Sequence, residues 1–115
     1  MSDSERRRGP RRPLKMRIDY KAGDGDFLYE YTRNISEGGL FVATDAPPKV
    51  GTVIQMRFQI PGENSSLKVE GKVKWVNASK DGREHPNPGM GVEFINLSDE
   101  ERDIISHIVG AIAYL

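Results

Sequence analysis

Apolar and polar residues alternate along most of the chain from residue 14 onward, as they do in strands that bury one face. In the first such stretch, Leu14, Met16, Ile18 and Tyr20 fall on one face. Further stretches follow, and clusters of Gly, Pro, Asn, Asp and Ser separate them as turns. The pattern predicts strands over residues 14–20, 27–35, 40–44, 53–60, 67–76 and 90–95.

The fifth stretch alternates most regularly. Lysines and a glutamate line one face, and the other face holds Leu67, Val69, Gly71, Val73 and Trp75. This pattern predicts that Trp75 lies in the core or in the wall of the sheet. Residues 77–89 are polar and rich in Gly and Pro, which predicts a longer loop.

The end of the chain has a helical pattern instead. Ser98 stands three residues before Glu101, which is the spacing of a capping box. The apolar residues that recur at helical spacing are Ile104, Ile105, Ile108, Val109 and Ile112. We expect a helix from about residue 99 to 113, and its apolar face must cover an open end of the sheet or pack on a partner.

Several short strands followed by one helix predict a mainly β fold, either a small antiparallel barrel or a sandwich. A chain of 115 residues suits one domain. Residues 1–13 lack an apolar period and hold five arginines, so they predict a basic, flexible arm. The predicted domain with its helix then covers residues 14–115.

The composition of the chain indicates the cellular compartment in which the protein resides. The chain has no cysteine, which excludes disulfides and thiolate metal sites. It has no apolar run near the roughly 18 residues that a membrane helix needs. Its N-terminus is charged where a signal peptide would be apolar. We expect a soluble, cytoplasmic protein without membrane insertion.

Charge is unevenly distributed although the formal net charge is zero. Residues 1–20 contain seven basic and three acidic residues, so the rest of the chain is net acidic. Such asymmetry favours an arm that binds an anion. An arm that only pairs with the acidic body would have the same composition.

Few residues are suited to catalysis. His85 and His107 are the only histidines, and they lie in unrelated contexts. Asp24 and Asp26 flank a glycine, but the further ligands of a calcium loop are missing, so a hairpin turn explains them better. We therefore expect neither an enzyme nor a metal site.

The arginines of the arm are better suited to binding. Five guanidinium groups fall within seven residues, at Arg6, Arg7, Arg8, Arg11 and Arg12. Guanidinium groups match phosphate oxygens and the O6/N7 edge of guanine, and they stack on bases. From the arm alone, a solvated tail without a specific ligand is an equal alternative.

A second polar cluster spans residues 34–39, between two predicted strands. Asn34 and Ser36 project to one side if the strand pattern holds, and two glycines follow. Glycines tolerate positive φ and permit a ligand to approach the backbone. By itself the cluster is typical of an ordinary turn.

Together, in this order, the two clusters resemble the PilZ domain family. That family has an R-x-x-x-R motif in an N-terminal arm, matched here by residues 7–11, and a [D/N]-x-S-x-x-G motif, matched by residues 34–39. Residues 71–76 and 89–94 are similar to its last two strands. Arg8 and Arg12 fit the first motif as well, so its register stays open.

The resemblance implies a six-stranded antiparallel β-barrel that binds cyclic di-GMP. By position, Arg7 and Arg11 would grip phosphate and the guanine edge, Arg8 would add a contact, and Gly39 would permit the turn. The ligand-binding residues so implied are Arg7, Arg8, Arg11, Arg12, Asn34, Ser36, Gly38 and Gly39, with Arg6 and Trp75 as further candidates.

A receptor without an output domain would act through a protein partner. The resemblance suggests control of motility or surface polysaccharide, with no cofactor besides the nucleotide ligand. One alternative is a PilZ-like interaction module that has lost nucleotide binding. Another is a nucleic-acid binder, which the net acidic body disfavours. Monomer and homodimer both remain open.

Overall fold

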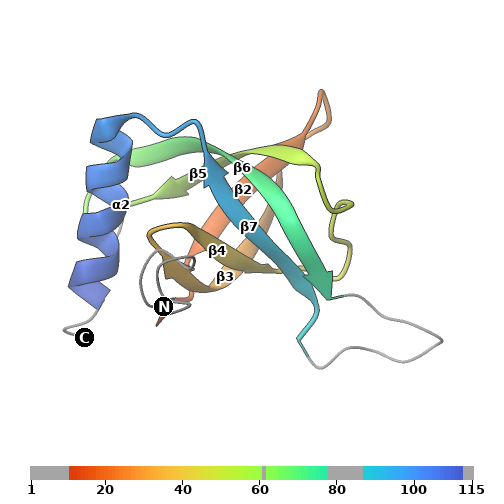
Figure 1. The fold of residues 1–115 in the computed structure, drawn as a ribbon, viewed down its shortest axis with the longest axis horizontal. Coiled ribbons are helices and arrows are strands. Elements are labelled where there is room, and N and C mark those ends of the chain that lie inside the picture. The colour runs from red at the N-terminus through yellow and green to blue at the C-terminus, as the bar shows by residue number, and fades with distance from the viewer. Residues whose placement is uncertain (1–10, 61, 78–86, 113–115) are drawn as a thin grey trace, which may run out of the picture.

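The computed structural model describes residues 11–60, 62–77 and 87–112. Within these residues the fold is mainly β, as predicted, with one helix near the C-terminus (Figure 1). The elements are β1 (Arg12–Pro13), β2 (Arg17–Ala22), β3 (Leu28–Ser36), β4 (Gly39–Ala43), β5 (Val53–Gln59), β6 (Ser66–Asn77), β7 (Gly89–Ile95) and α2 (Asp99–Ile112).

The longer strands close into an antiparallel barrel. Each of β2, β5, β6, β7 and β4 pairs with the next, and β3 pairs with both β4 and β2 to complete the ring. Closure leaves none of the long strands in the described residues with a free edge. The predicted six-stranded barrel is therefore confirmed, and the sandwich is excluded. The short β1 lies along β3 beyond the start of β2, so the chain from β1 to β2 follows one edge of β3.

Alternation along the strands fills the interior with apolar side chains. Residues of the central core that are no more than 2% exposed include Ile18, Tyr20, Leu40, Ile54, Met56, Phe58, Val73 and Val92. In Figure 1, α2 lies across one end of the barrel. Ile105, Ile108 and Val109 on its inner face belong to the same core. The helix therefore covers that end of the barrel within the chain itself.

A side chain fills the gap between β1 and β2. The register of β3 shifts between Thr32 and Asn34, which marks a β-bulge. Thr32 is buried, and its hydroxyl donates to the Leu14 carbonyl at 2.6 Å. The same oxygen accepts from the Met16 N–H at 3.0 Å. Thr32 thus satisfies two backbone groups at the point where the strand ladder is interrupted.

A second bulge places Trp75 on the opposite face from Val73. The pairing of β6 with β7 shifts between Val73 and Trp75, so the alternation predicted from the sequence ends at Val73. Val73 is fully buried, whereas Trp75 is 44% exposed. The indole therefore lies on the outer wall of the barrel, one of the two positions that the sequence predicted, whereas the prediction that Trp75 shares a face with Val73 was wrong.

The helix begins as its capping box predicts. The Glu101 N–H donates to the Ser98 hydroxyl at 3.1 Å, and the Ser98 N–H donates to the Glu101 carboxylate at 2.9 Å. These reciprocal bonds satisfy donors that the first turn leaves free. The described part of α2 ends at Ile112, and the predicted last residue, 113, lies outside the described residues. No helix in the described ranges has the length and hydropathy needed to span a membrane.

Candidate functional site

The end of the basic arm lies beside the polar cluster that follows β3. Strand β1 pairs with the end of β3, placing Arg12 opposite Ile35 and Pro13 opposite Asn34. Just before β1, the Arg11 guanidinium donates a hydrogen bond of 2.8 Å from Nη1 to the Asn34 Oδ1. The structure therefore brings together one residue from each of the two sequence motifs.

No acidic side chain of the described residues neutralises the charge of Arg11. Its hydrogen-bond acceptor is a neutral amide, and no ion pair joins Arg11 to an acidic side chain in the described ranges. Although Arg11 as a residue is exposed, nearby protein displaces part of its water, and this desolvation lowers the pKa of the guanidinium from its ordinary value. A guanidinium remains charged at neutral pH. An anionic group at this position would thus meet a partly desolvated cation with unused donors.

Arg12 faces the other way. Residues directly opposite each other in a pair of strands share a face, and the partner of Arg12 is the fully buried Ile35. The Arg12 Nε is buried and has no hydrogen-bond acceptor. Two consecutive arginines therefore lie on opposite faces of the sheet, and only Arg11 contacts Asn34.

The serine of the turn after β3 stabilises the turn itself. Ser36 is 1% exposed. Its hydroxyl accepts from the Gly38 N–H and donates to the Gly39 carbonyl, both at 3.3 Å. These bonds hold the turn that connects β3 to β4. The structure thus places the Ser36 side chain within the turn and not on the outer surface beside Arg11.

Packing explains the second glycine of the turn, Gly39. Neither Gly38 nor Gly39 has a positive φ, so the expected left-handed backbone is absent from this turn. A Cβ on Gly39 would collide with the backbone carbonyl of Val92 in β7. Gly39 therefore permits close approach of two strands, which is a different reason from the one that the sequence suggested.

An aromatic platform, formed by Phe41 and Trp75, continues the outer surface from Asn34. Asn34 is opposite Phe41, and both Phe41 and Trp75 are opposite Gly91. A Cβ on Gly91 would collide with the Trp75 ring, and one on Gly89 would collide with the Phe41 ring. The two glycines therefore leave room for the rings to stack, with centroids 5.2 Å apart and planes at 23°. Sequence reasoning missed Phe41. The alternating glycines of the segment Gly89-Met90-Gly91 were the available signal, since a strand glycine often lies under an aromatic ring.

A groove borders the same surface on the other side of β1. It is lined in part by Lys15, Tyr31 and Arg33. Lys15 and Arg33 are exposed, and the Lys15 Nζ lies 5.1 Å from the centre of the Tyr31 ring. Arg33 occupies the bulge next to Asn34. These two cations, which the sequence did not single out as binding candidates, add positive charge to the groove beside β1.

These residues are suited to binding a nucleotide. Guanidinium groups bind phosphate or the guanine edge, an amide both donates and accepts, and an exposed indole offers a face for a base. The described residues hold no group of three or more side chains placed to share a metal ion. Arg6, Arg7, Arg8 and His85 lie outside the described residues, and His107 is exposed on α2.

Comparison with known proteins agrees with this fold. The model of the PilZ domain family matches residues 5–111. The PilZ domain of CeSA from a cellulose-synthesising bacterium superposes with a TM-score of 0.67 at 18% identity, over 91% of this chain and 99% of that one. No curated protein sequence matches the chain significantly.

Several of the similar structures were solved with c-di-GMP. The PilZ domain of YcgR from Escherichia coli, solved with c-di-GMP, has a TM-score of 0.72 at 15% identity, over 90% of this chain and 88% of that one. The MrkH–c-di-GMP complex of K. pneumonia has a TM-score of 0.70 at 15% identity, over 91% of this chain and 50% of that one. At such identities these likenesses establish a shared fold.

Proposed function

The chain belongs to the PilZ domain family, and we propose that it is a receptor for cyclic di-GMP and not an enzyme. The observation that carries the proposal is the hydrogen bond between Arg11 and Asn34, which joins the arm and the polar cluster into one surface. Similar folds that were solved with c-di-GMP support the choice of ligand.

The chemistry of the surface fits this ligand part by part. A phosphate would neutralise the Arg11 charge, which the Asn34 amide leaves uncompensated. A guanine has both donors and acceptors at its edge for Asn34 and for a guanidinium. A base could also stack on the exposed indole of Trp75 at the edge of the aromatic platform.

The contact of Arg11 favours one register of the arm motif. We propose Arg7 and Arg11 as the R-x-x-x-R pair, because Arg11 reaches the outer surface whereas Arg12 faces the buried side. Arg6 and Arg8 would add phosphate or stacking contacts, as the motif spacing suggests. Arg12 would then hold β1 in place and make no direct ligand contact.

The turn residues would support ligand binding by holding Asn34 in place, without contacting the ligand themselves. The Ser36 hydroxyl is already hydrogen-bonded to the backbone of Gly38 and Gly39. Its role in ligand binding would therefore be to fix the turn that presents Asn34. Gly38 and Gly39 serve the same purpose. In this proposal, Asn34 and the arm arginines make the ligand contacts, and the turn supplies their geometry.

Ligand binding would fix the part of the arm that precedes β1 against the barrel, and so change the surface that a protein partner meets. Ordering costs roughly 1–2 kcal/mol per backbone residue. Charge-assisted hydrogen bonds of roughly 1.5–3 kcal/mol each would offset that cost. An adaptor of this kind, acting in the cytoplasm on motility or surface polysaccharide, is the regulatory role that we infer.

Hydrogen exchange tests the ordering step. Amides of residues 6–12 should exchange more slowly when cyclic di-GMP saturates the protein. Unchanged exchange in the presence of demonstrated nucleotide binding would contradict the ordering of the arm. If nucleotide binding were also absent, a PilZ-type module that binds only protein would be the better description.

A further inference from the structure

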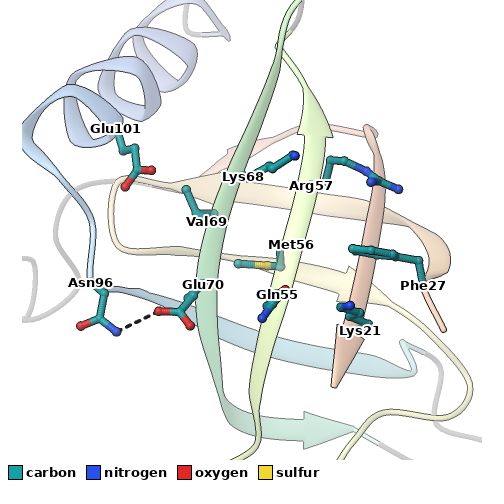
Figure 2. A pocket seen from close by; sticks show the side chains of 10 residues that line it. All are labelled: Lys21, Phe27, Gln55, Met56, Arg57, Lys68, Val69, Glu70, Asn96 and Glu101. Carbon is teal, nitrogen blue, oxygen red and sulfur yellow. Dashed lines mark hydrogen bonds between the residues drawn. The ribbon is translucent and has the colours of Figure 1, made fainter. Parts of the chain in front are cut away.

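A second group of cations and aromatic rings covers the outer face of β2, β5, β6 and the start of β3, beyond the groove beside β1. We call it the cationic face, and it consists of Arg17, Lys21, Phe27, Tyr29, Arg57 and Lys68. Several of these residues line a hollow on that side of the barrel (Figure 2). None of them belongs to the arm, the turn after β3 or the aromatic platform.

The rings of this face are capped by cations. The Arg57 guanidinium lies 4.3 Å from the centre of the Phe27 ring, and the Lys21 ammonium lies 5.0 Å from it. Figure 2 shows the Phe27 ring between these two side chains. The Arg17 guanidinium lies 4.4 Å from the centre of the Tyr29 ring. Phe27 and Tyr29 are 40% and 59% exposed, so rings and cations reach solvent together.

A single carboxylate aligns the two arginines. Asp19 accepts from the Arg17 Nε and from the Arg57 Nη2, each at 3.2 Å. Each guanidinium has five N–H donors, so both retain donors for a further acceptor. Side chains that are already held in place lose less entropy on binding, which favours association.

The cationic face also has a net positive charge. Four cations lie there with the Asp19 carboxylate, and two further carboxylates, Glu70 and Glu101, line the border of the hollow, which leaves an excess of one positive charge. Arg57 is directly opposite Lys68 in the β5–β6 pair, and like charges in that arrangement are destabilising. Glu70 accepts from the Asn96 amide at 3.0 Å and Glu101 from the Ser98 N–H at 2.9 Å, so within the described residues both bind neutral donors and neither forms an ion pair with a cation of this face. An anionic partner would relieve this repulsion.

We propose that the cationic face is a docking surface for an acidic segment of a partner protein. Arginine and aromatic side chains dominate the binding energy of protein interfaces, and both occur here beside an excess of positive charge. A single-stranded nucleic acid is disfavoured because it needs free ring faces for its bases. Here cations already lie over Phe27 and Tyr29, whereas a carboxylate can accept from those cations without displacing them.

Fluorescence anisotropy with an acidic peptide tests the docking surface. The probe is a labelled peptide of about twelve residues built from Glu-Asp-Leu triplets, titrated at low salt, where charge pairing is strongest. The wild type should bind it, and Arg17→Gln/Arg57→Gln should weaken binding by about tenfold or more. Lys21→Gln/Lys68→Gln, which leaves the Asp19 ion pairs intact, should weaken it in the same direction.

A matched control tests whether peptide affinity depends on where the two positive charges are removed or only on their number. Lys49→Gln/Arg102→Gln removes the same two charges from the loop before β5 and from the exposed side of α2, and should change affinity by less than about twofold. Cyclic di-GMP titration of each variant should match the wild type, because the cationic face lies outside the nucleotide site. Failure of nucleotide binding and failure of peptide binding can therefore be told apart.

Several results would overturn the docking surface. One is equal peptide affinity for the wild type and both cationic-face variants. Another is no binding up to about 1 mM peptide, which corresponds to a negligible interaction. Tighter binding of an oligo-dT strand than of the peptide would reassign the surface to nucleic acid. A wild-type dimer in sedimentation that dissociates in Arg17→Gln/Arg57→Gln would reassign it to a second copy of the chain.

Discussion

The guanidinium of Arg11 donates a hydrogen bond of 2.8 Å to the side-chain oxygen of Asn34, a residue 23 positions later in the sequence. This contact spans the two motifs of the PilZ family and gives the proposed ligand a continuous surface. It also leaves the Arg11 charge uncompensated, since the acceptor is a neutral amide. A dianionic nucleotide would supply the missing charge.

Arg11 and Asn34 should act as a coupled pair in nucleotide binding. Asn34→Ala should weaken binding of cyclic di-GMP by about tenfold, because it removes a polar contact and the group that positions Arg11. Arg11→Ala/Asn34→Ala should lose less than the sum of the single changes, with a coupling of about 1 kcal/mol measured by calorimetry. Asn64→Ala, in an exposed turn, is the control and should bind as the wild type does. Strictly additive losses would argue against the coupling.

Thr32 should be important for the stability of the β1–β2 junction. Thr32→Val keeps the shape but leaves the Leu14 carbonyl and the Met16 N–H without their partner. We expect the free energy of unfolding to fall by about 2–3 kcal/mol in urea titrations. Thr52→Val makes the same chemical change at a hydroxyl with no hydrogen bond within the described residues, and should have little effect. Equal effects of the two substitutions would contradict this role.

Gly39 and Gly110 should respond oppositely to alanine. Gly39→Ala forces a Cβ onto the Val92 carbonyl, and the overpacking should destabilise the barrel by about 2–3 kcal/mol. Gly110→Ala adds a Cβ in open space on the exposed side of α2 and should stabilise the protein by about 1 kcal/mol. Urea unfolding of both variants measures the two changes in the free energy of unfolding. A neutral Gly39→Ala would show that β4 and β7 can move apart.

Trp75 should report on ligand binding. It is the only tryptophan of the chain, and its indole is 44% exposed on the aromatic platform. A stacked guanine should change its fluorescence, and Trp75→Ala should weaken binding about tenfold, since one stacked base contributes about 1–3 kcal/mol. Tyr29→Ala removes an exposed ring from the cationic face and should leave nucleotide affinity unchanged. Unaltered fluorescence at saturation would exclude the platform from the site.

The fold was predictable because its signals are local. Alternation placed the six long strands, and the capping box of Ser98 and Glu101 placed the start of α2. Barrel closure itself needed the family resemblance, because alternation alone cannot distinguish a barrel from a sandwich. The bulges after Thr32 and Val73 were not predictable, since one extra residue in a strand leaves little trace in composition.

The candidate site was predictable in part for the same reason. Spacing identified Arg11 and Asn34, and the structure brings them into contact. The outward position of Trp75 depends on the β6 bulge, and its contact with Phe41 depends on which strands are neighbours. Separation of Arg11 from Arg12 depends on the register of β1 against β3. Such features come from tertiary pairing, which a single sequence does not specify.

Calorimetric titration with cyclic di-GMP tests the proposed receptor most directly. The wild type should show saturable heat, with GTP as a nucleotide control that binds weakly or not at all. Arg11→Ala should lose at least about tenfold in affinity, because it removes a charge-assisted contact, whereas Arg102→Ala on α2 should match the wild type. Absence of heat from the wild type, together with an unchanged melting temperature at high nucleotide concentration, would contradict the receptor function.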